Sequence, residues 1–234
     1  MVVKPDTVLL SNVGMNVAKG HFGIDGLISG IIDHHPAVSL KMEMRDNDLQ
    51  ELLTQFKNFD QTTFTNDNIK GALTADVVFK SEITNDYSFK TESLDGEMYV
   101  KIAGGALKDI PTLSKQSNFL TKGRKLDHIL LDTTEFNVVL KGSEMHLNPT
   151  RVISSPGDFN IQAVYDLEDQ QKTKILFKVP LRNLFKRYSS LEEMEFNQFK
   201  GNGIPIIIES RYKKGKLKFK WKLFVNRKKR GYDT

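Results

Sequence analysis

The feature that most limits what this chain can fold into is an alternation of apolar and polar residues. It is clearest between residues 216 and 223, where Leu217, Phe219, Trp221 and Leu223 alternate with four lysines. Because successive side chains of an extended strand point to opposite faces, a period of two is typical of a half-buried β-strand. The pattern recurs in at least seven segments, each with one continuous apolar side. We therefore expect a protein built mainly from β-strands.

Helical segments are few compared with this apolar surface. Residues 46–59 switch to a helical period, with Leu49, Leu52, Leu53 and Phe56 in one stripe. A sheet with little helical cover must close on itself, pack on another sheet or curve into a trough. We predict a mainly β fold with a few short helices, in which an antiparallel, strongly curved sheet forms an apolar groove or a flattened barrel.

A groove of this kind would be lined by the large residues on the apolar sides of the strands. Acyl chains suit it chemically, because a strand of six to eight residues spans about 20–26 Å, comparable to a phospholipid tail. The alternative is that the same residues fill a closed core, and the alternation fits both. The candidate lining residues are Met98, Val100, Ile102, Phe136, Val138, Leu140, Phe159, Ile161, Phe177, Val179, Phe219 and Trp221.

Glycine and proline positions predict where strands end. Gly104 and Gly105 predict a turn, because glycine reaches positive φ without a Cβ penalty, and a short return strand and a helix over 109–120 would follow. Five glycines between residues 8 and 32 predict short strands with tight turns. Pro205 suggests an edge position for the strand at 204–208, and Pro180 opens a short helix over 181–188.

Charge is distributed unevenly along the chain. The net charge is +5, yet residues 211–234 hold eleven lysines and arginines and one acid. Such asymmetry suggests a polyanionic neighbour, either a lipid surface or nucleic acid. Lys216, Lys218, Lys220 and Lys222 are candidates for contact with anionic head groups, or simply guard an exposed strand. Nucleic acid is disfavoured, because the aromatic residues of this strand fall on the opposite side and build no stacking platform for bases.

The sequence offers little catalytic chemistry. There is no GxSxG, Walker A, HExxH or GxGxxG motif. There is also no cysteine, so disulfides and thiolate metal sites are excluded. His128 and His146 lie near strand ends and fit packed or surface residues better than a general base. We expect no enzymatic activity, no cofactor and no metal.

Several segments resemble the C-terminal domain of AsmA-like proteins. The resemblance covers residues 37–225 of what we expect to be one domain over 1–234, with a basic tail at 226–234. It consists of an apolar strand, a glycine turn, a helix and a series of alternating strands, with matched apolar and glycine positions in order and spacing. The segments are 48–79, 96–120, 126–167 and 178–187.

This resemblance implies a function in the bacterial cell envelope. The AsmA-like family is similar in architecture to bridge-like lipid transfer proteins, and its members are linked to phospholipid traffic between the inner and outer membranes and to outer-membrane assembly. It implies a periplasmic chain tethered to the inner membrane through an N-terminal helix that this sequence lacks, which suggests a fragment of a longer protein. The expected partners are phospholipids, an anionic membrane surface and outer-membrane assembly proteins. The alternative is a scaffold for outer-membrane protein assembly with a closed β core.

Overall fold

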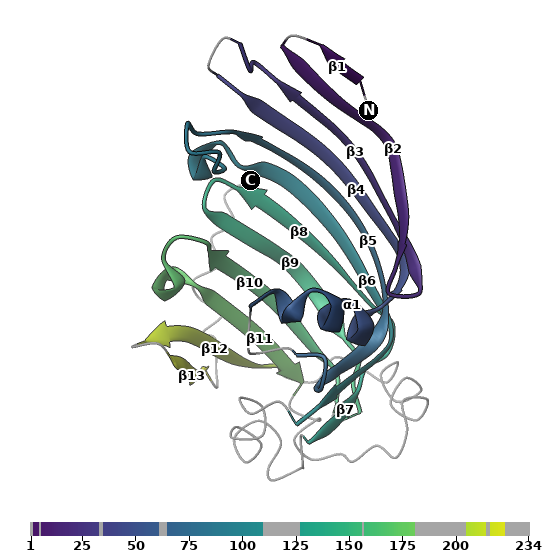
Figure 1. Cartoon of the computed structure of the whole chain (residues 1–234). Coiled ribbons are helices and arrows are strands. Elements are labelled where there is room, and N and C mark those ends of the chain that lie inside the picture. The colour runs from purple at the N-terminus through teal and green to yellow at the C-terminus, as the bar shows by residue number, and fades with distance from the viewer. Residues whose placement is uncertain are drawn as a thin grey trace, which may run out of the picture.

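The computed structural model describes residues 2–4, 6–32, 35–60, 65–109, 127–155, 157–180, 205–213 and 216–222. Within these residues, thirteen antiparallel strands form one sheet, and twelve of them follow a single open path from β1 to β13, with β7 paired to β6 beside it (Figure 1). The prediction of a mainly β, antiparallel, curved sheet is confirmed, and the flattened barrel is excluded because the path does not close. The strands are β1 (Val2–Lys4), β2 (Thr7–Val17), β3 (Gly20–Ser29), β4 (Ala37–Asp48), β5 (Ile69–Glu82), β6 (Asp95–Lys108), β7 (His128–Leu130), β8 (Thr134–Lys141), β9 (Glu144–Val152), β10 (Phe159–Asp166), β11 (Lys174–Pro180), β12 (Pro205–Lys213) and β13 (Lys216–Lys222).

One α-helix lies within the described residues. Helix α1 (Leu49–Gln55) follows β4 directly, and the Asp48 carboxylate caps it by accepting a hydrogen bond from the Glu51 N–H at 3.0 Å. Leu49, Leu52 and Leu53 are buried, and α1 packs against β5 and β4. Three residues of the predicted stripe therefore form a packing face, whereas the fourth, Phe56, follows the helix as its C-cap and is 50% exposed. Three short 3-10 turns complete the described structure: η1 (Lys57–Asp60), η2 (Thr91–Ser93) and η3 (Gln170–Lys172).

Four β-bulges bend the sheet. In each, two residues of one strand oppose one residue of its neighbour, which bends the bulged strand and increases its twist. The bulged strands β2, β4, β6 and β9 are every second strand of the path, and Figure 1 shows the long strands curving along their length. The bulges are Ser11-Asn12 opposite Asp25, Arg45-Asp46 opposite Thr74, Gly104-Gly105 opposite Gly71, and Asn148-Pro149 opposite Gln162.

Two of these bulges share one stabilising device. Asn12 and Asp46 have left-handed φ values of 52° and 53°, a conformation that Asn and Asp tolerate better than most residues. The Asn12 N–H donates to Asp25 Oδ1 at 2.7 Å. The Asp46 N–H donates to Thr74 Oγ1 at 3.3 Å. In both cases a side chain of the neighbouring strand satisfies the amide that the sheet ladder leaves unpaired.

The glycine predictions were wrong in two places. Gly104 and Gly105 do not reverse the chain, because β6 runs through them and they form its bulge. Residues 8–32 form two long strands, β2 and β3, rather than several short ones. The turn between β2 and β3 is made by Ala18 and Lys19, with φ of 47° and 63°.

Further predictions concern the strand that begins at Pro205 and two helices, one after residue 108 and one after residue 180. The strand predicted at 204–208 is not an edge, because β12 pairs with both β11 and β13, and Pro205 is tolerated as its first residue. The helix predicted over 109–120 lies outside the described residues except for its first position, and the one over 181–188 lies wholly outside them.

Candidate functional site

Strand registers place all twelve predicted lining residues on one face of the sheet. Residues directly opposite each other in an antiparallel pair share a face. Met98 opposes Val138, and Val138 opposes Leu147. The same row continues through Ala163 and Ile175 to Ser210 and Phe219. We call this side the apolar face and the other side the polar face.

The apolar face also extends over the N-terminal strands, where no lining residue was predicted. From Met98 the row runs to Val77, Met42, Ile24 and Val13. Ile24 and Val13 were missed because residues 8–32 were predicted to form short strands, whereas Val77 and Met42 lie outside that stretch and were not assigned to the lining. The signal that would have found them is the alternation itself, which continues through the glycines.

No paired position of the apolar face carries a charged residue or a histidine. This holds for every strand of the path by register, and the most polar side chains there are hydroxyls and one amide, such as Tyr165, Ser210 and Asn47. The polar face of the same strands carries most of the charge, for example Glu43, Asp76 and Lys101. The face therefore offers apolar contact over the whole path and no charged group for acid–base chemistry.

Side chains on the apolar face are only partly covered. Ten of the twelve predicted lining residues have described side chains, and all ten are half-buried rather than buried. A sealed core would remove most of them from solvent. Of the ten buried apolar residues that the structure describes, four lie at positions of this face and three lie in α1; the four are Val38, Ala75, Val152 and Ile208. Within the described residues this face is thus open rather than sealed beneath a second sheet.

Curvature explains why these residues are nevertheless partly shielded. Val78, on the polar face of β5, is 46% exposed, whereas its neighbour Val77 on the apolar face is half-buried. Side chains on the inner side of a curved sheet crowd together, as Phe159 and Phe177 do at a ring separation of 5.9 Å. The apolar face is therefore the inner side of the sheet.

The polar face is held by ion pairs and hydrogen bonds. Arg45 Nη2 lies 2.5 Å from Asp76 Oδ1 and 3.2 Å from Glu43 Oε2. Its Nη1 also donates to the Ala75 carbonyl at 3.0 Å. The hydrogen bond to Asp76 raises the pKa of Arg45 above its ordinary value. This cluster joins β4 to β5 beside a bulge, which gives it a structural role.

The predicted lysine ladder lies on the polar face, opposite the lining residues. By register, Lys218 follows Arg211 and Lys174 in one row, and Lys222 lies in the row of Lys178. Glu209 is the one acid at the paired polar-face positions of β11 to β13. The ladder is therefore part of a wider basic patch. We define the basic patch by the basic residues at these polar-face register positions, which are Lys174, Lys178, Arg211, Lys213, Lys216, Lys218, Lys220 and Lys222; of those in β13, the side chains of Lys218 and Lys220 are described, and both are exposed.

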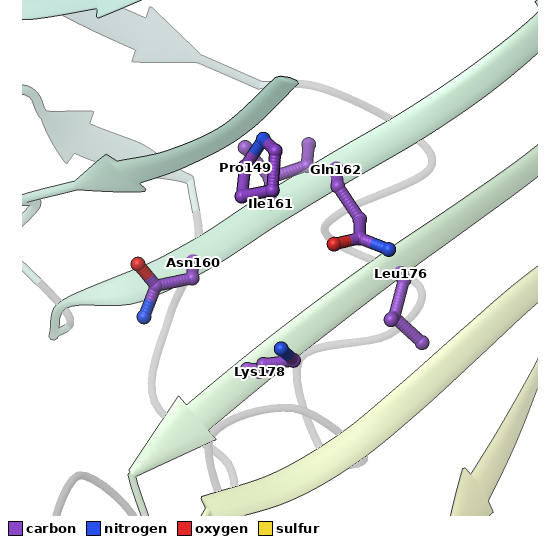
Figure 2. Close-up of a pocket in the computed structure, with 6 residues that line it drawn as sticks. All are labelled: Pro149, Asn160, Ile161, Gln162, Leu176 and Lys178. Atoms are coloured by element: carbon purple, nitrogen blue, oxygen red, sulfur yellow. The ribbon is translucent and has the colours of Figure 1, made fainter. Parts of the chain in front are cut away.

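A shallow hollow of about 270 Å³ lies over β10 and β11 beside the bulge of β9 (Figure 2). The register pairs Asn160 with Lys178 and Gln162 with Leu176, on the polar face. Neither a carboxylate nor a histidine lines it. Its lining residues are Pro149, Asn160, Ile161, Gln162, Leu176 and Lys178.

The described part of the chain contains no cluster of three or more histidines and carboxylates that could hold a metal ion. No helix in the same part is long and apolar enough to span a membrane. Comparison of the chain with protein-family models, with curated proteins and with solved structures finds no match. The functional argument therefore rests on the apolar face and the basic patch.

Proposed function

We propose that this chain is a non-enzymatic lipid-binding module that holds acyl chains along its apolar face. The observation that carries the proposal is the open, charge-free face that runs through all twelve strands of the path. Exposed apolar surfaces larger than a few hundred Å² mark binding sites or interfaces in soluble proteins. A long apolar trough without charged residues is suited to uncharged acyl chains.

The chemistry of a phospholipid matches the division between the two faces. Each CH₂ group removed from water contributes about 0.8 kcal/mol, so a long acyl chain gains from contact with residues such as Phe136 and Ile161. The head group remains at the rim of the sheet in water. Binding and release then need no bond to form or break.

The basic patch supplies a second contact, with an anionic membrane surface. Lys218 and Lys220 are exposed, and each cation near such a surface contributes about 1 kcal/mol. The patch and the groove lie on opposite faces, so the patch orients the protein and does not line the lipid path. A place in the periplasm, phospholipid transport between the inner and outer membranes and outer-membrane assembly are proposals that rest on the AsmA-like resemblance.

Native mass spectrometry of the whole chain after gentle purification tests the proposal. We expect mass increments of one or more phospholipids that disappear after delipidation and return on incubation with vesicles. A chain that never retains lipid, and does not bind a fluorescent fatty acid in titration, would contradict the proposal. The scaffold alternative would gain if a protein partner protected the same face.

A further inference from the structure

One rim of the sheet carries exposed large apolar side chains at three separate loops. The ends of β3, β5 and β10 lie at the same rim. The register pairs Ser29 with Ala37, and Ala37 with Glu82 at the end of β5. It continues from β5 to Asp95 of β6, and from there through Lys141 and Glu144 to Asp166 at the end of β10. Figure 1 shows these loops along the left side of the sheet. Their exposed residues are Ile31 and Ile32 after β3, Tyr87 and Phe89 after β5, and Leu167 after β10.

The loop after β5 holds its aromatic residue outward at a conformational cost. Tyr87 is 91% exposed and has a φ of 63°, which is an outlier for a bulky residue. Its N–H donates to the Thr84 carbonyl at 3.0 Å, and the Thr84 N–H donates to the Ser88 carbonyl at 2.8 Å. The Ser88 N–H donates to Thr84 Oγ1 at 3.1 Å. A strained residue fixed by its surroundings suggests a function for the side chain that it projects.

The rim is continuous with the apolar face. Phe89 packs edge-on against Phe79, with ring centroids 5.1 Å apart, and Phe79 belongs to the apolar face through its register with Leu40. Ile28 of the apolar face likewise precedes Ile31 by three residues. An acyl chain that leaves a bilayer at the loop after β5 would pass from Phe89 to Phe79 and so reach the apolar face.

We propose that this rim inserts into the surface of a phospholipid bilayer and is the side from which lipid reaches the groove. The inference rests on the proposed function, because it names the place where that function meets the membrane. The three loops span six strand spacings, roughly 29 Å at about 4.8 Å each, so they suit an extended flat partner. A protein interface of usual size instead needs one contiguous patch of about 800 Å² on each partner.

Charges in the loop after β5 bear on the depth of insertion and on the lipid class. Asp86 stands beside Tyr87 and accepts hydrogen bonds from the Thr84 and Ser88 hydroxyls, while Lys90 and Glu82 neutralise each other at 2.7 Å. A charged carboxylate stays in the hydrated head-group layer, where tyrosine is also favoured. The expected partner is thus a zwitterionic surface such as phosphatidylcholine, and binding should not weaken with salt, unlike binding through the basic patch.

The absence of cysteine from the sequence makes the test direct. Single variants Tyr87→Cys, Ile32→Cys and Leu167→Cys, labelled with an environment-sensitive fluorophore, are mixed with phosphatidylcholine vesicles in low and high salt. Val78→Cys and Leu27→Cys on the polar face, also exposed, are the matched controls. We expect a blue shift at the three rim sites only, at both salt concentrations, and about tenfold weaker vesicle binding by Phe89→Ser.

Absence of a shift at the three rim sites overturns the inference, as does an equal shift at the controls. A shift that grows with protein concentration without vesicles would assign the rim to contact between copies of the chain and also overturn it. Lipid retention in native mass spectrometry is scored separately. If lipid is retained but the rim sites show no shift, the proposed lipid-binding function is supported and the rim inference is contradicted. If the rim sites shift but no lipid is retained, the membrane contact is supported and lipid binding in the groove is contradicted.

Discussion

Val138 and Val139 are successive residues of β8 that face opposite sides of the sheet. Val138 opposes Met98 and Leu147 on the apolar face. Val139 opposes Glu97 and His146 on the polar face. Both side chains are half-buried. The pair therefore separates the effect of the apolar face from the effect of substitution in this strand.

Val138→Asp is expected to weaken lipid binding by at least roughly tenfold, because it places a carboxylate against acyl chains. Val139→Asp should bind lipid as the native chain does. Titration with a fluorescent fatty acid measures both, and circular dichroism checks that each variant is folded. Equal loss in the two variants would argue against a groove, and selective unfolding of Val138→Asp would favour a closed core.

Asp48 should make stability depend on pH below its ordinary pKa of 3.8. The hydrogen bond from the Glu51 N–H lowers its pKa in the folded state, and Lys19 at 3.1 Å adds to the effect. A lowered pKa means that the carboxylate stabilises the fold above the ordinary value, and that this contribution is lost as the pH falls through the folded-state pKa. Urea unfolding of Asp48→Asn should therefore vary less with acid pH.

Capping by Asp48 can be separated from its charge. Asn accepts the same hydrogen bond at a helix N-terminus, whereas Ala cannot, so Asp48→Ala should cost about 1 kcal/mol at neutral pH and Asp48→Asn less. Asp67→Asn, at an exposed position, is the control for the loss of a carboxylate. The same cost for Asn and Ala would show that the ion pair with Lys19, and not the cap, stabilises α1.

Gly20 and Gly142 should respond differently to alanine. A Cβ at Gly20 would lie 2.6 Å from the Asn47 N, so Gly20→Ala must displace backbone and should cost about 1–3 kcal/mol. Gly142 has open space around it but a φ of 58°, so Gly142→Ala should cost about 1–2 kcal/mol. Thermal and urea unfolding measure both. Gly142→Asn should restore part of the loss, because Asn tolerates this φ, while Gly20→Asn should not.

Binding to anionic vesicles should depend on the basic patch. Replacing Lys218 and Lys220 with Gln removes two exposed cations, and each should lower affinity about fivefold at low salt. High salt should abolish the difference. Lys41→Gln with Lys80→Gln, exposed on the polar face at the other end of the sheet, is the control. Equal losses of affinity in the two double variants would show that binding depends on net charge and not on the position of the patch.

Strand identity was predictable from the sequence wherever the alternation keeps its phase. The twelve lining residues fall in β6, β8, β10, β11 and β13, and they share a face because period two fixes the side. The bulges were not predicted, although they leave a trace. In β2 the apolar positions change from Val8 and Leu10 to Val13 and Met15, a shift of one residue at the bulge.

The glycine-based predictions were partly wrong because glycine is required for two physical reasons, a positive φ or space for a close neighbour. At Gly142 it allows positive φ in a turn. At Gly20 and Gly26 it leaves room for a close neighbour, and a Cβ at Gly26 would lie 2.8 Å from Leu40 Cδ2. Which reason applies depends on the adjacent strand. The openness of the apolar face likewise depends on what covers it, which alternation within one strand does not encode.

The linear strand order has a consequence for how the protein forms and comes apart. Apart from β6 with β8, each strand of the path pairs only with strands next to it in sequence. No pairing joins the first strand to the last, so hairpins can add one after another as the chain emerges, and loop closure stays inexpensive in entropy. Opening should begin at either edge and move inward. Amide exchange should be slowest in the long central strands β5 and β6 and fastest at β1 and β13.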